Sequence, residues 1–581
     1  MKKIFKGMLI GIKNSLERFP ETIGISTICV ILLIYISEIT GGASGNLIET
    51  LRRVVMVIAL GIPLSLSIKL FFERLENYNK ALLYATYLVS TVLLVLYYYF
   101  FLQDIEIISI SRYIGVTLVL YLVFLFISYL PKRDDFEFFV IRVFTRFFTT
   151  ILYSIVLYIG LAAILFTIDK LLGINIKSEL YYYTYLIVAG IFAPIFFLAG
   201  IKAKHEILTI KEYSRLLMVL VLYIIMPLIC IYTIILYIYF GKIIITRTWP
   251  EGLVSNLVLW YSAIAAAVLF FISPMLNEKA WPTRFMKYFP KAILPLIIMM
   301  FFSIGIRIDA YGVTENRYFV VALGIWTFLV MIYFVAKKKL KNIILPISLA
   351  AITTISVFGP ISSYSISKYS QNNRLTKIFV KNNMIKDNKV IKASVKVTDE
   401  DAIAITSIVN YFDANHSISD VKGLPENFKI MDMEKTLGIK YSEGNYQNRN
   451  EYFYFDSVGS TQLIDISGYD YLFVLRNNGK QSNENATISM NFNNESSTLN
   501  ITKNKNNIYN KNLKDFANKL IDKYPDGQKD QSLSQEEMSF VDENEKVKIK
   551  IQFLNISGNN STSSDSIEPK NFEFYVVVKM K

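Results

Sequence analysis

Four charged side chains and two tyrosines gather within residues 307–318, RIDAYGVTENRY. A guanidinium binds phosphate or carboxylate through a planar fork, and a carboxylate can pair with a cation or exchange a proton. The candidate polar site comprises Arg307, Asp309, Tyr311, Glu315 and Arg317, with Trp249 and Glu251 from the preceding connection on the same side. The competing interpretation is structural: Gly312 supplies a turn with positive φ, Thr314 caps the next helix, and the loop anchors at a membrane surface.

Other chemistry is sparse. The chain has no Walker loop, GxGxxG, HExxH, GxSxG or kinase signature, so the sequence predicts no cofactor, no metal site and no named reaction. Its two histidines, His205 and His416, are expected at the surface. Both cysteines, Cys29 and Cys230, lie in apolar segments, which excludes a disulfide in the tail. The catalytic residues, if there are any, stay unknown.

Apolar segments must position the candidate site. Eleven of them fill residues 21–361, and at about 1.5 Å rise per residue they match a hydrocarbon core roughly 30 Å thick. The expected spans are 21–40, 54–72, 81–102, 114–130, 147–168, 180–201, 216–240, 254–276, 292–306, 318–336 and 343–361. Prolines at 63, 194, 227, 295 and 346 mark either broken helices around a cavity or ordinary membrane helices. The fold class is a polytopic all-α membrane bundle.

The distribution of basic residues predicts the orientation. One alternating set of connections holds 23 Lys and Arg in 78 positions, and the other set holds 9 in 59. The first set is therefore expected in the cytoplasm, and it includes residues 1–20, a basic amphipathic segment on the inner leaflet. The net charge of +14 thus reports topology and predicts no nucleic-acid partner. An odd number of spans places the N-terminus inside and residues 362–581 outside.

The tail, residues 362–581, is predicted to fold as a separate extracytoplasmic α+β domain. Residues 398–412 and 513–521 show helical spacing of apolar side chains. Residues 488–492, 547–553 and 572–578 alternate as strands do, and 452–455 and 471–475 are apolar runs. The stretch 555–570, rich in Asn, Ser and Gly, is expected to be a loop.

The loop motif also resembles a known family. RIDAYGVTENRY with Trp326, together with residues 17–20, 249–252, 371–375 and 382–384, is similar to the signature of an uncharacterised bacterial membrane family, domain of unknown function 4153. The resemblance implies a multi-pass cell-envelope protein of the bacterial plasma membrane. It implies no activity, because the family has no established one.

Two functional interpretations stay open. The first is a non-enzymatic module that transports an envelope component, or senses or scaffolds through its outer domain. The second is a membrane-embedded transferase that acts on lipid-linked envelope glycan precursors. Such a transferase generally needs acidic residues in a sizeable outer loop, and the expected outer loops before the tail have only about 11–13 residues, which favours the first interpretation. The expected partners are the lipid bilayer and an envelope anion, a lipid-linked precursor or an envelope protein.

Overall fold

The computed structural model describes residues 2–581 apart from 41–44, 76–77, 131–134, 173, 175, 202–212, 247–252, 277–279, 338, 388, 395, 426–427, 440–451, 458–465, 476–486, 494–495, 505, 525–529 and 561–566. The chain forms two compact units: residues 1–397 with 408–438, and residues 439–581 with 398–407. The helical unit therefore extends past residue 361, which was the expected end of the bundle, and takes in part of the tail.

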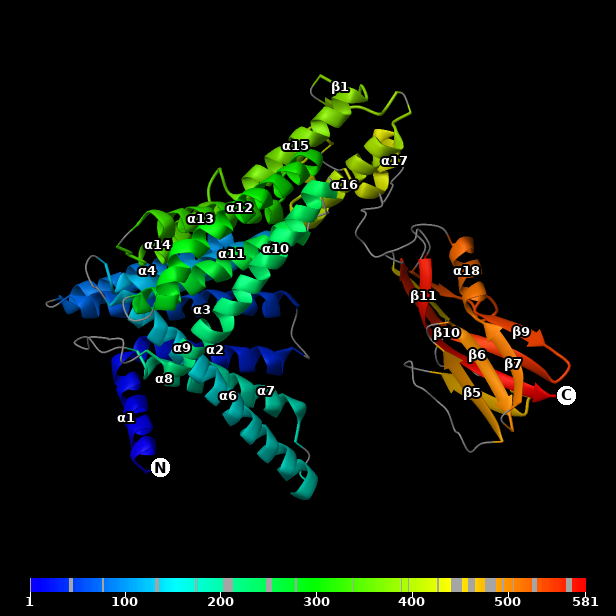
Figure 1. Ribbon diagram of the computed structural model, residues 1–581, viewed down its shortest axis with the longest axis horizontal. Coiled ribbons are helices and arrows are strands. Elements are labelled where there is room, and N and C mark those ends of the chain that lie inside the picture. Colours follow the sequence, from blue (N-terminus) through cyan, green and yellow to red (C-terminus); the bar gives the residue numbers. More distant parts are fainter. Residues whose placement is uncertain are drawn as a thin grey trace. The chain divides into compact units, whose positions relative to one another are not determined.

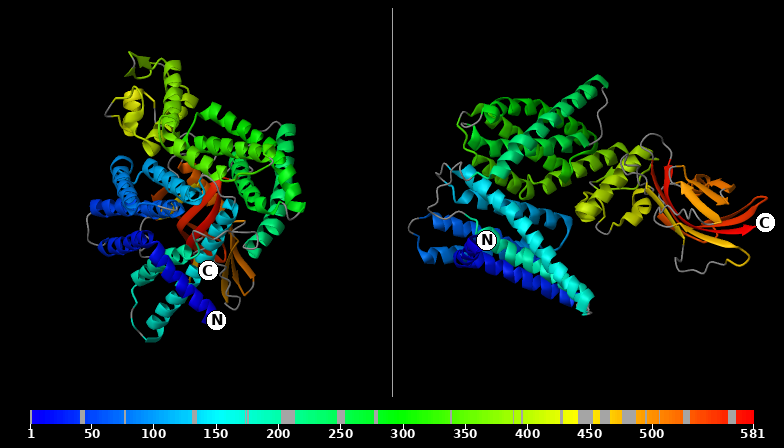
Figure 2. Two further views of the ribbon diagram at one scale, coloured as in Figure 1. Left: turned by 90° about the vertical axis from the view of Figure 1, so that its left-hand side faces the viewer. Right: turned by 60° about the horizontal axis from the view of Figure 1, so that its bottom comes forward.

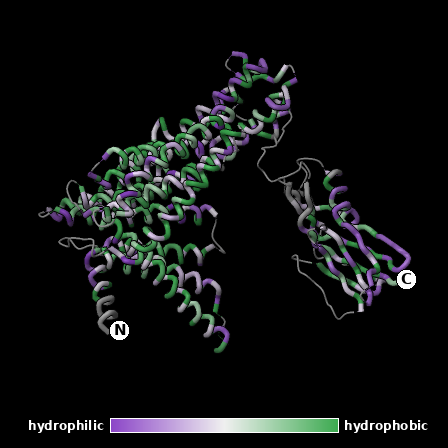
Figure 3. Tube along the Cα trace, viewed as in Figure 1, coloured by the Kyte–Doolittle hydropathy of each residue, from purple (hydrophilic) through white to green (hydrophobic). Residues whose placement is uncertain are grey.

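The helical unit is built from long apolar helices (Figures 1 and 3). They are α1 (Lys2–Arg18), α2 (Pro20–Ile39), α3 (Gly45–Arg74), α4 (Lys80–Phe101), α5 (Ile107–Ile127), α6 (Phe136–Leu172), α7 (Ser178–Ile187), α8 (Ala193–Leu198), α9 (Arg215–Val219), α10 (Met226–Thr246), α11 (Leu253–Ile272), α12 (Ala280–Tyr311), α13 (Glu315–Ala336), α14 (Ile344–Val357) and α15 (Ser363–Lys381). A short hairpin, β1 (Ile385–Lys386) and β2 (Lys389–Val390), follows, and the unit ends with α17 (Met433–Leu437). Helix α16 (Asp399–Asn415) begins in the second unit and ends in this one.

The membrane bundle predicted from the sequence is confirmed. Ten helices in the described part of the chain, between residues 20 and 336, are long and apolar enough to cross a bilayer. The helices α2 to α8 and the helices α10 to α15 form two groups, seen in blue to cyan and in green (Figure 2). Helix α5 packs against α14 at the seam, where a Cβ on Gly115 would approach Val357 to 2.8 Å. Glycine at this position therefore permits the close packing of the two helices.

Two of the prolines sit just after π-helical turns. The turn Val188–Phe192 precedes Pro194, and the turn Leu220–Ile225 precedes Pro227. Proline lacks an N–H and its ring crowds the carbonyl four residues earlier, which for Pro194 is that of Gly190. Ser26 on α2 donates its hydroxyl to this carbonyl at 2.5 Å. The helix therefore widens at Pro194, and a side chain from α2 bonds the carbonyl that proline cannot reach.

The eleventh expected span, 343–361, is helical only from Ile344 to Val357. Gly359 has a φ of +88°, and Pro360 follows it, so the helix stops at residue 357. Fourteen residues of helix rise only about 21 Å. The chain continues without helix to Ser362, the N-cap of α15.

The segment 341–361 nevertheless runs back along α13. At one end the backbone N–H of Lys341 donates to the hydroxyl of Tyr333. Midway, Trp326 Nε1 donates to Ser348 Oγ at 3.0 Å. At the other end the Tyr318 hydroxyl donates to the carbonyl of Ile361 at 2.6 Å. The helix and its extended continuation together therefore return the chain to the level at which α13 begins.

Hydrogen bonds join one alternating set of connections at one end of the bundle, which we call the basic rim. Arg18 pairs with Glu73 at 2.7 Å and donates to the carbonyl of Ile201 at 3.0 Å. Arg142 Nε donates to the carbonyl of Gly200 at 3.1 Å. In addition, the Asn342 amide donates to Glu137 at 2.9 Å and to Ser273 at 2.8 Å. Connections that alternate along the sequence thus lie together.

Described residues of the other set of connections meet at the opposite end of the bundle, which we call the opposite rim. Arg53 donates to the carbonyl of Gln103, and the Tyr183 hydroxyl donates to Glu38 at 2.6 Å. The rings of Phe101 and Phe358 meet edge to face with centroids 5.0 Å apart. The Arg112 guanidinium lies 5.2 Å from the centre of the Tyr364 ring, which brings α15 to this rim. The start of α13 and the end of segment 341–361 belong to the same rim.

The second unit is a sandwich of two β-sheets. Its elements are β3 (Tyr452–Ser457), β4 (Tyr471–Leu475), β5 (Ile488–Asn493), β6 (Thr498–Lys503), β7 (Asn506–Asn512), α18 (Lys514–Lys523), β8 (Asp530–Leu533), β9 (Ser539–Glu543), β10 (Val547–Asn560) and β11 (Ile567–Met580). One sheet has the order β4-β11-β10-β3-β8, with β9 also paired to β10, and the other has the order β5-β6-β7. Phe492 of the small sheet packs on Phe572 and Phe574 of the large one. The predicted α+β tail is confirmed.

The expected loop 555–570 is wrong over most of its length. Strand β10 continues to Asn560 and β11 starts at Ile567. The continuation of β10 pairs with β11 on one side and with β3 on the other, so its backbone groups bond in both directions. These ladder hydrogen bonds outweigh the low strand propensity of Asn, Ser and Gly.

Candidate functional site

The loop 312–314 connects α12 to α13 in a short, defined turn. Gly312 has a φ of +72°, as the sequence predicted. A Cβ at this position would lie 2.9 Å from the Gln371 side-chain nitrogen, so both the backbone and the space require glycine. Thr314 stands at the N-cap of α13 in an extended conformation, but its side chain makes no capping hydrogen bond. The expected threonine cap is therefore wrong, and other side chains hold the loop.

Helix α15 holds the loop through its polar face. The Gln371 amide, buried to 3% exposure, donates to the carbonyls of Tyr311 and Val313, both at 3.0 Å. The Ser370 hydroxyl accepts from the backbone N–H of Val313 at 2.9 Å. The bonds of Gln371 join two of the sequence segments that carry the family resemblance, 307–318 and 371–375.

Arg317 closes the turn from the other side. Its Nη1 donates to the carbonyl of Gly312 at 2.6 Å and to that of Tyr311 at 3.2 Å. Its guanidinium carbon lies 5.5 Å from the centre of the Tyr311 ring, and that of Arg374 lies 5.9 Å from the same centre. Two cations thus flank one aromatic ring at the end of α12, where they also oppose the partial negative charge of the helix terminus.

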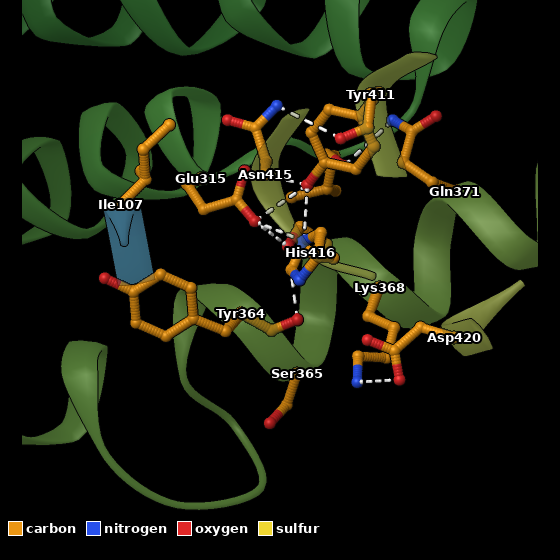
Figure 4. Close-up of polar contacts among 12 residues, drawn as sticks. Ile107, Glu315, Tyr364, Ser365, Lys368, Gln371, Tyr411, Asn415, His416 and Asp420 are labelled. Carbon is orange, nitrogen blue, oxygen red and sulfur yellow. Dashed lines mark hydrogen bonds and ion pairs between the residues drawn. The ribbon is translucent and has the colours of Figure 1, made fainter. Parts of the chain in front are cut away.

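The Glu315 carboxylate is the centre of a buried polar cluster (Figure 4). It accepts hydrogen bonds from Ser367 Oγ at 2.5 Å and from the Tyr411 hydroxyl at 2.7 Å to each oxygen. Its Oε1 also lies 2.8 Å from Nε2 of His416. The side chain of Glu315 is 16% exposed and that of His416 is 0% exposed. The cluster joins α13, α15 and the end of α16.

The cluster has a clear electrostatic effect on Tyr411. Burial raises the pKa of the Tyr411 hydroxyl, and the negative charge of Glu315 raises it further. The hydroxyl therefore stays protonated and serves as a donor to Glu315. Its oxygen lies 3.0 Å from His416 Nε2, so the three side chains form one connected network.

A second set of bonds fixes the chain that follows His416. Lys368 on α15 pairs with Asp420 at 2.6 Å. The Asn372 amide donates to the carbonyl of Asp420 at 3.0 Å, and its oxygen accepts from the backbone N–H of Lys422 at 2.8 Å. Helix α15 thus binds the loop 312–314 and the residues after α16 at the same time.

The cluster contains a serine, a histidine and a carboxylate but not in the arrangement of a nucleophilic triad. In a triad the histidine lies between the serine and the carboxylate and takes the proton of the serine. Here the carboxylate lies between them, and both Ser367 and His416 contact Glu315. Ser367 is also 0% exposed, so no substrate reaches it. The arrangement is suited to holding segments together.

The other candidate residues stand apart from this cluster. Arg307 is half-buried and Asp309 is exposed near the end of α12, and neither side chain makes a hydrogen bond or ion pair with another described residue. Trp249 and Glu251 lie outside the described residues. A hollow of about 470 Å³ lies at the same rim as the start of α13, opposite the basic rim. It is lined by Thr40, Gly45, Ile48, Glu49, Arg52 and Ile105, and none of the candidate residues lines it.

The sequence analysis missed Ser367, Tyr411 and His416. His416 was expected at the surface and is buried, because Glu315 and Tyr411 bond its ring inside the unit. The signal that could have found it is its place four residues after Phe412, where it continues the apolar stripe of α16 one residue past the end of the helix. Nothing in the sequence links that stripe to residue 315.

The chain belongs to the family described as domain of unknown function (DUF4153), which matches residues 25–389. The match includes Glu315, Ser367 and Gln371, and it ends before Tyr411 and His416. An uncharacterized protein of Pasteurella multocida (strain Pm70) is 22% identical over 342 residues, which are 58% of this chain and 57% of that protein. No solved structure matches the chain.

Proposed function

We propose that this DUF4153 protein is a non-enzymatic sensing or scaffold module of the bacterial plasma membrane. In this proposal the bundle anchors the protein in the bilayer and the β-rich unit is displayed outside the cell, where it meets an envelope component. The buried polar cluster around Glu315 is the joint at which the chain leaves the bundle.

The saturated carboxylate of Glu315 carries this proposal. An acid or base of a transferase must reach its substrate, whereas Glu315 already accepts bonds from Ser367, Tyr411 and His416. The donors come from segments that follow the last expected span, so the cluster ties the start of α13 to the way out of the bundle. A carboxylate of this kind is suited to holding segments together, because removing one partner of a buried charged network strongly lowers the stability of the fold.

The orientation rests on two independent observations. The positive-inside rule assigns the basic rim to the cytoplasm, because its connections carry the excess of Lys and Arg. The segment 341–361 runs the length of α13 and supports an odd number of crossings. Together they favour a cytoplasmic N-terminus and an extracellular β-rich unit.

An assay of lipid-linked precursor turnover tests the non-enzymatic assignment against the transferase. Full-length protein in lipid nanodiscs would be incubated with undecaprenyl-pyrophosphate-linked glycan precursors, with and without a polyol acceptor. We expect no consumption of precursor. Turnover that is abolished by Glu38→Gln or by Asp309→Asn would overturn the proposal, because both carboxylates are exposed, Glu38 at the rim opposite the basic rim and Asp309 near the end of α12.

A further inference from the structure

The outward face of the three-stranded sheet β5-β6-β7 is built only from uncharged hydrogen-bonding side chains. The strand register arranges its positions in three rows, which are Ser489, Thr502 and Asn507, then Asn491, Asn500 and Asn510, then Asn493, Thr498 and Asn512. All nine are exposed or half-buried. We call this face the amide grid. It measures roughly 10 Å across the strands and 14 Å along them.

The opposite face of the same sheet packs into the sandwich core, which explains why polar and apolar residues alternate along its strands. It does not explain why the polar face carries no charge. Met490, Leu499 and Ile501 point into the sandwich core and are at most 3% exposed. Hydrophilic and hydrophobic residues alternate along β5 and β6. A wet sheet face usually carries lysine and glutamate, and the tail holds 28 basic and 28 acidic residues to supply them. The large sheet does so, with Lys548, Lys550 and Lys579 at alternate positions between buried ones.

Hydrogen bonds hold several side chains of the grid in place. Asn493 accepts from the backbone N–H of Ser496 at 3.2 Å, and Asn512 accepts from that of Lys514 at 2.8 Å. The Ser489 and Thr502 hydroxyls lie 2.7 Å apart. In the central row the Asn510 amide donates to the Asn500 oxygen. Because the side chains are already ordered, binding a ligand costs less conformational entropy.

We propose that the amide grid binds a neutral polysaccharide chain of the cell envelope. Each asparagine offers both a donor and an acceptor, and each hydroxyl offers either, which matches the successive hydroxyl and amide groups of a glycan. Among its described residues, the face holds no cation that would select a phosphate or sulfate polymer, and no apolar side chain that would select a membrane or a protein. The proposal rests on the extracellular placement of this unit in the proposed function.

The grid lacks aromatic side chains, so affinity must come from many weak contacts. A hydrogen bond exchanged with water contributes only about 0.5–1.5 kcal/mol, and one sugar residue would therefore bind poorly. A chain that covers the rows of the grid gains from several contacts at once. We expect polymers to bind and monosaccharides to compete weakly.

Co-sedimentation with insoluble polymers tests the proposal on the full-length protein in detergent. The probes are cellulose and chitin as neutral polymers, and carboxymethyl cellulose as an anionic polymer with the same backbone. We expect the wild-type protein to sediment with at least one neutral polymer and several-fold less with carboxymethyl cellulose. Wild-type protein that sediments with neither neutral polymer would overturn the proposal.

Substitutions in the central row locate the binding face. Asn491→Ala, Asn500→Ala and Asn510→Ala, combined in one protein, should lower binding about tenfold, which is roughly 1.4 kcal/mol. Asn506→Asp and Asn506→Ala are the matched controls, because Asn506 is exposed on the same strand but lies outside the grid, opposite Lys503. Both controls should bind within about twofold of the wild type. Equal binding by the triple variant, or an equal loss in the controls, would overturn the assignment.

Two further comparisons keep the test decisive. If the triple variant does not fold, as judged by proteolysis, the single change Asn500→Ala takes its place and should lower binding severalfold. Binding in detergent does not depend on the topology of the protein in the membrane, so sugar binding and topology are tested separately. A cytoplasmic location of the β-rich unit would contradict the proposed function, but it would not change the result of the sedimentation assay.

Discussion

At the residue scale, Glu315 acts as a tie between segments that are far apart in the sequence. Its donors Ser367 and Tyr411 follow it by 52 and 96 residues. If the carboxylate is removed, its donors lose their acceptor, and if the donors are removed, the carboxylate stays without hydrogen bonds. The protein interior cannot solvate either group as water would. The stability of the helical unit should therefore depend strongly on this one side chain.

Replacing Glu315 tests this dependence. Glu315→Ala leaves the His416 ring and the Tyr411 hydroxyl without their acceptor and should lower the free energy of unfolding by about 3–5 kcal/mol. Glu315→Gln keeps one acceptor oxygen and should cost less, about 1–3 kcal/mol. Thermal unfolding in detergent measures both, with the exposed Asp309→Asn as a silent control. Equal melting of Glu315→Ala and wild type would contradict the role.

Arg317 tests whether the guanidinium fork matters at the loop. Arg317 makes both carbonyl contacts through Nη1 alone, so the feature that lysine cannot reproduce is the planar guanidinium over the Tyr311 ring. We expect Arg317→Lys to lose function in a complementation assay at normal membrane abundance, and Arg307→Lys to have a milder effect. If both variants behave as wild type, the loop is only an anchor.

At the element scale, the turn between α12 and α13 is shaped to fit α15. Gly312→Ala should destabilise the protein by about 1–3 kcal/mol, because the residue has a φ of +72° and its new Cβ would lie 2.9 Å from Gln371. Gly359→Ala is the matched control: its φ is +88°, and nothing lies within 4 Å of the new Cβ. Thermal unfolding should show the larger loss for Gly312→Ala. A larger loss for Gly359→Ala would mean that α15 does not set the turn.

In the β-rich unit, Glu537 should make the region around α18 sensitive to acid. The ammonium of Lys523 at 2.6 Å and the hydroxyls of Tyr524 and Ser534 lower the pKa of Glu537 to about 2. A lowered pKa stabilises the folded state above the ordinary value of 4.5, and this contribution is lost as the pH falls toward 2.

Thermal unfolding at several pH values measures this contribution. Glu537→Gln should unfold at a lower temperature than wild type at pH 4.5 and above, and the difference should close near pH 2. Glu536→Gln, its exposed neighbour, is the control. A difference between Glu537→Gln and wild type that stays constant down to pH 2 would contradict the assigned ion pair.

At the scale of the whole molecule, the orientation of the bundle can be measured with single cysteines. In a background of Cys29→Ala and Cys230→Ala, cysteines at positions 80 and 339 should resist an impermeant thiol reagent in intact cells. Cysteines at positions 106 and 491 should react. Reaction at 339 with protection at 491 would reverse the orientation, and protection at both 339 and 491 would mean that segment 341–361 does not cross.

The sequence by itself determined the class of the protein and the location of its elements. Continuous apolar runs and strict alternation follow from the length of a membrane crossing and from the pleat of a strand, which are local rules. They predicted the helical spans, the strands at 547–553 and 572–578, and the positive φ of Gly312. The motif in residues 307–318 identified the family in the same way, since it depends on neighbouring residues alone.

Only the tertiary structure decided which polar side chains meet. The sequence grouped Arg307, Asp309 and Glu315 because they are neighbours along the chain, whereas folding brought Glu315 to Tyr411 and His416. It also extended β10 through an Asn-rich stretch. In each case a hydrogen bond to a distant segment outweighed the local preference, because a buried polar group must find a partner wherever the fold supplies one.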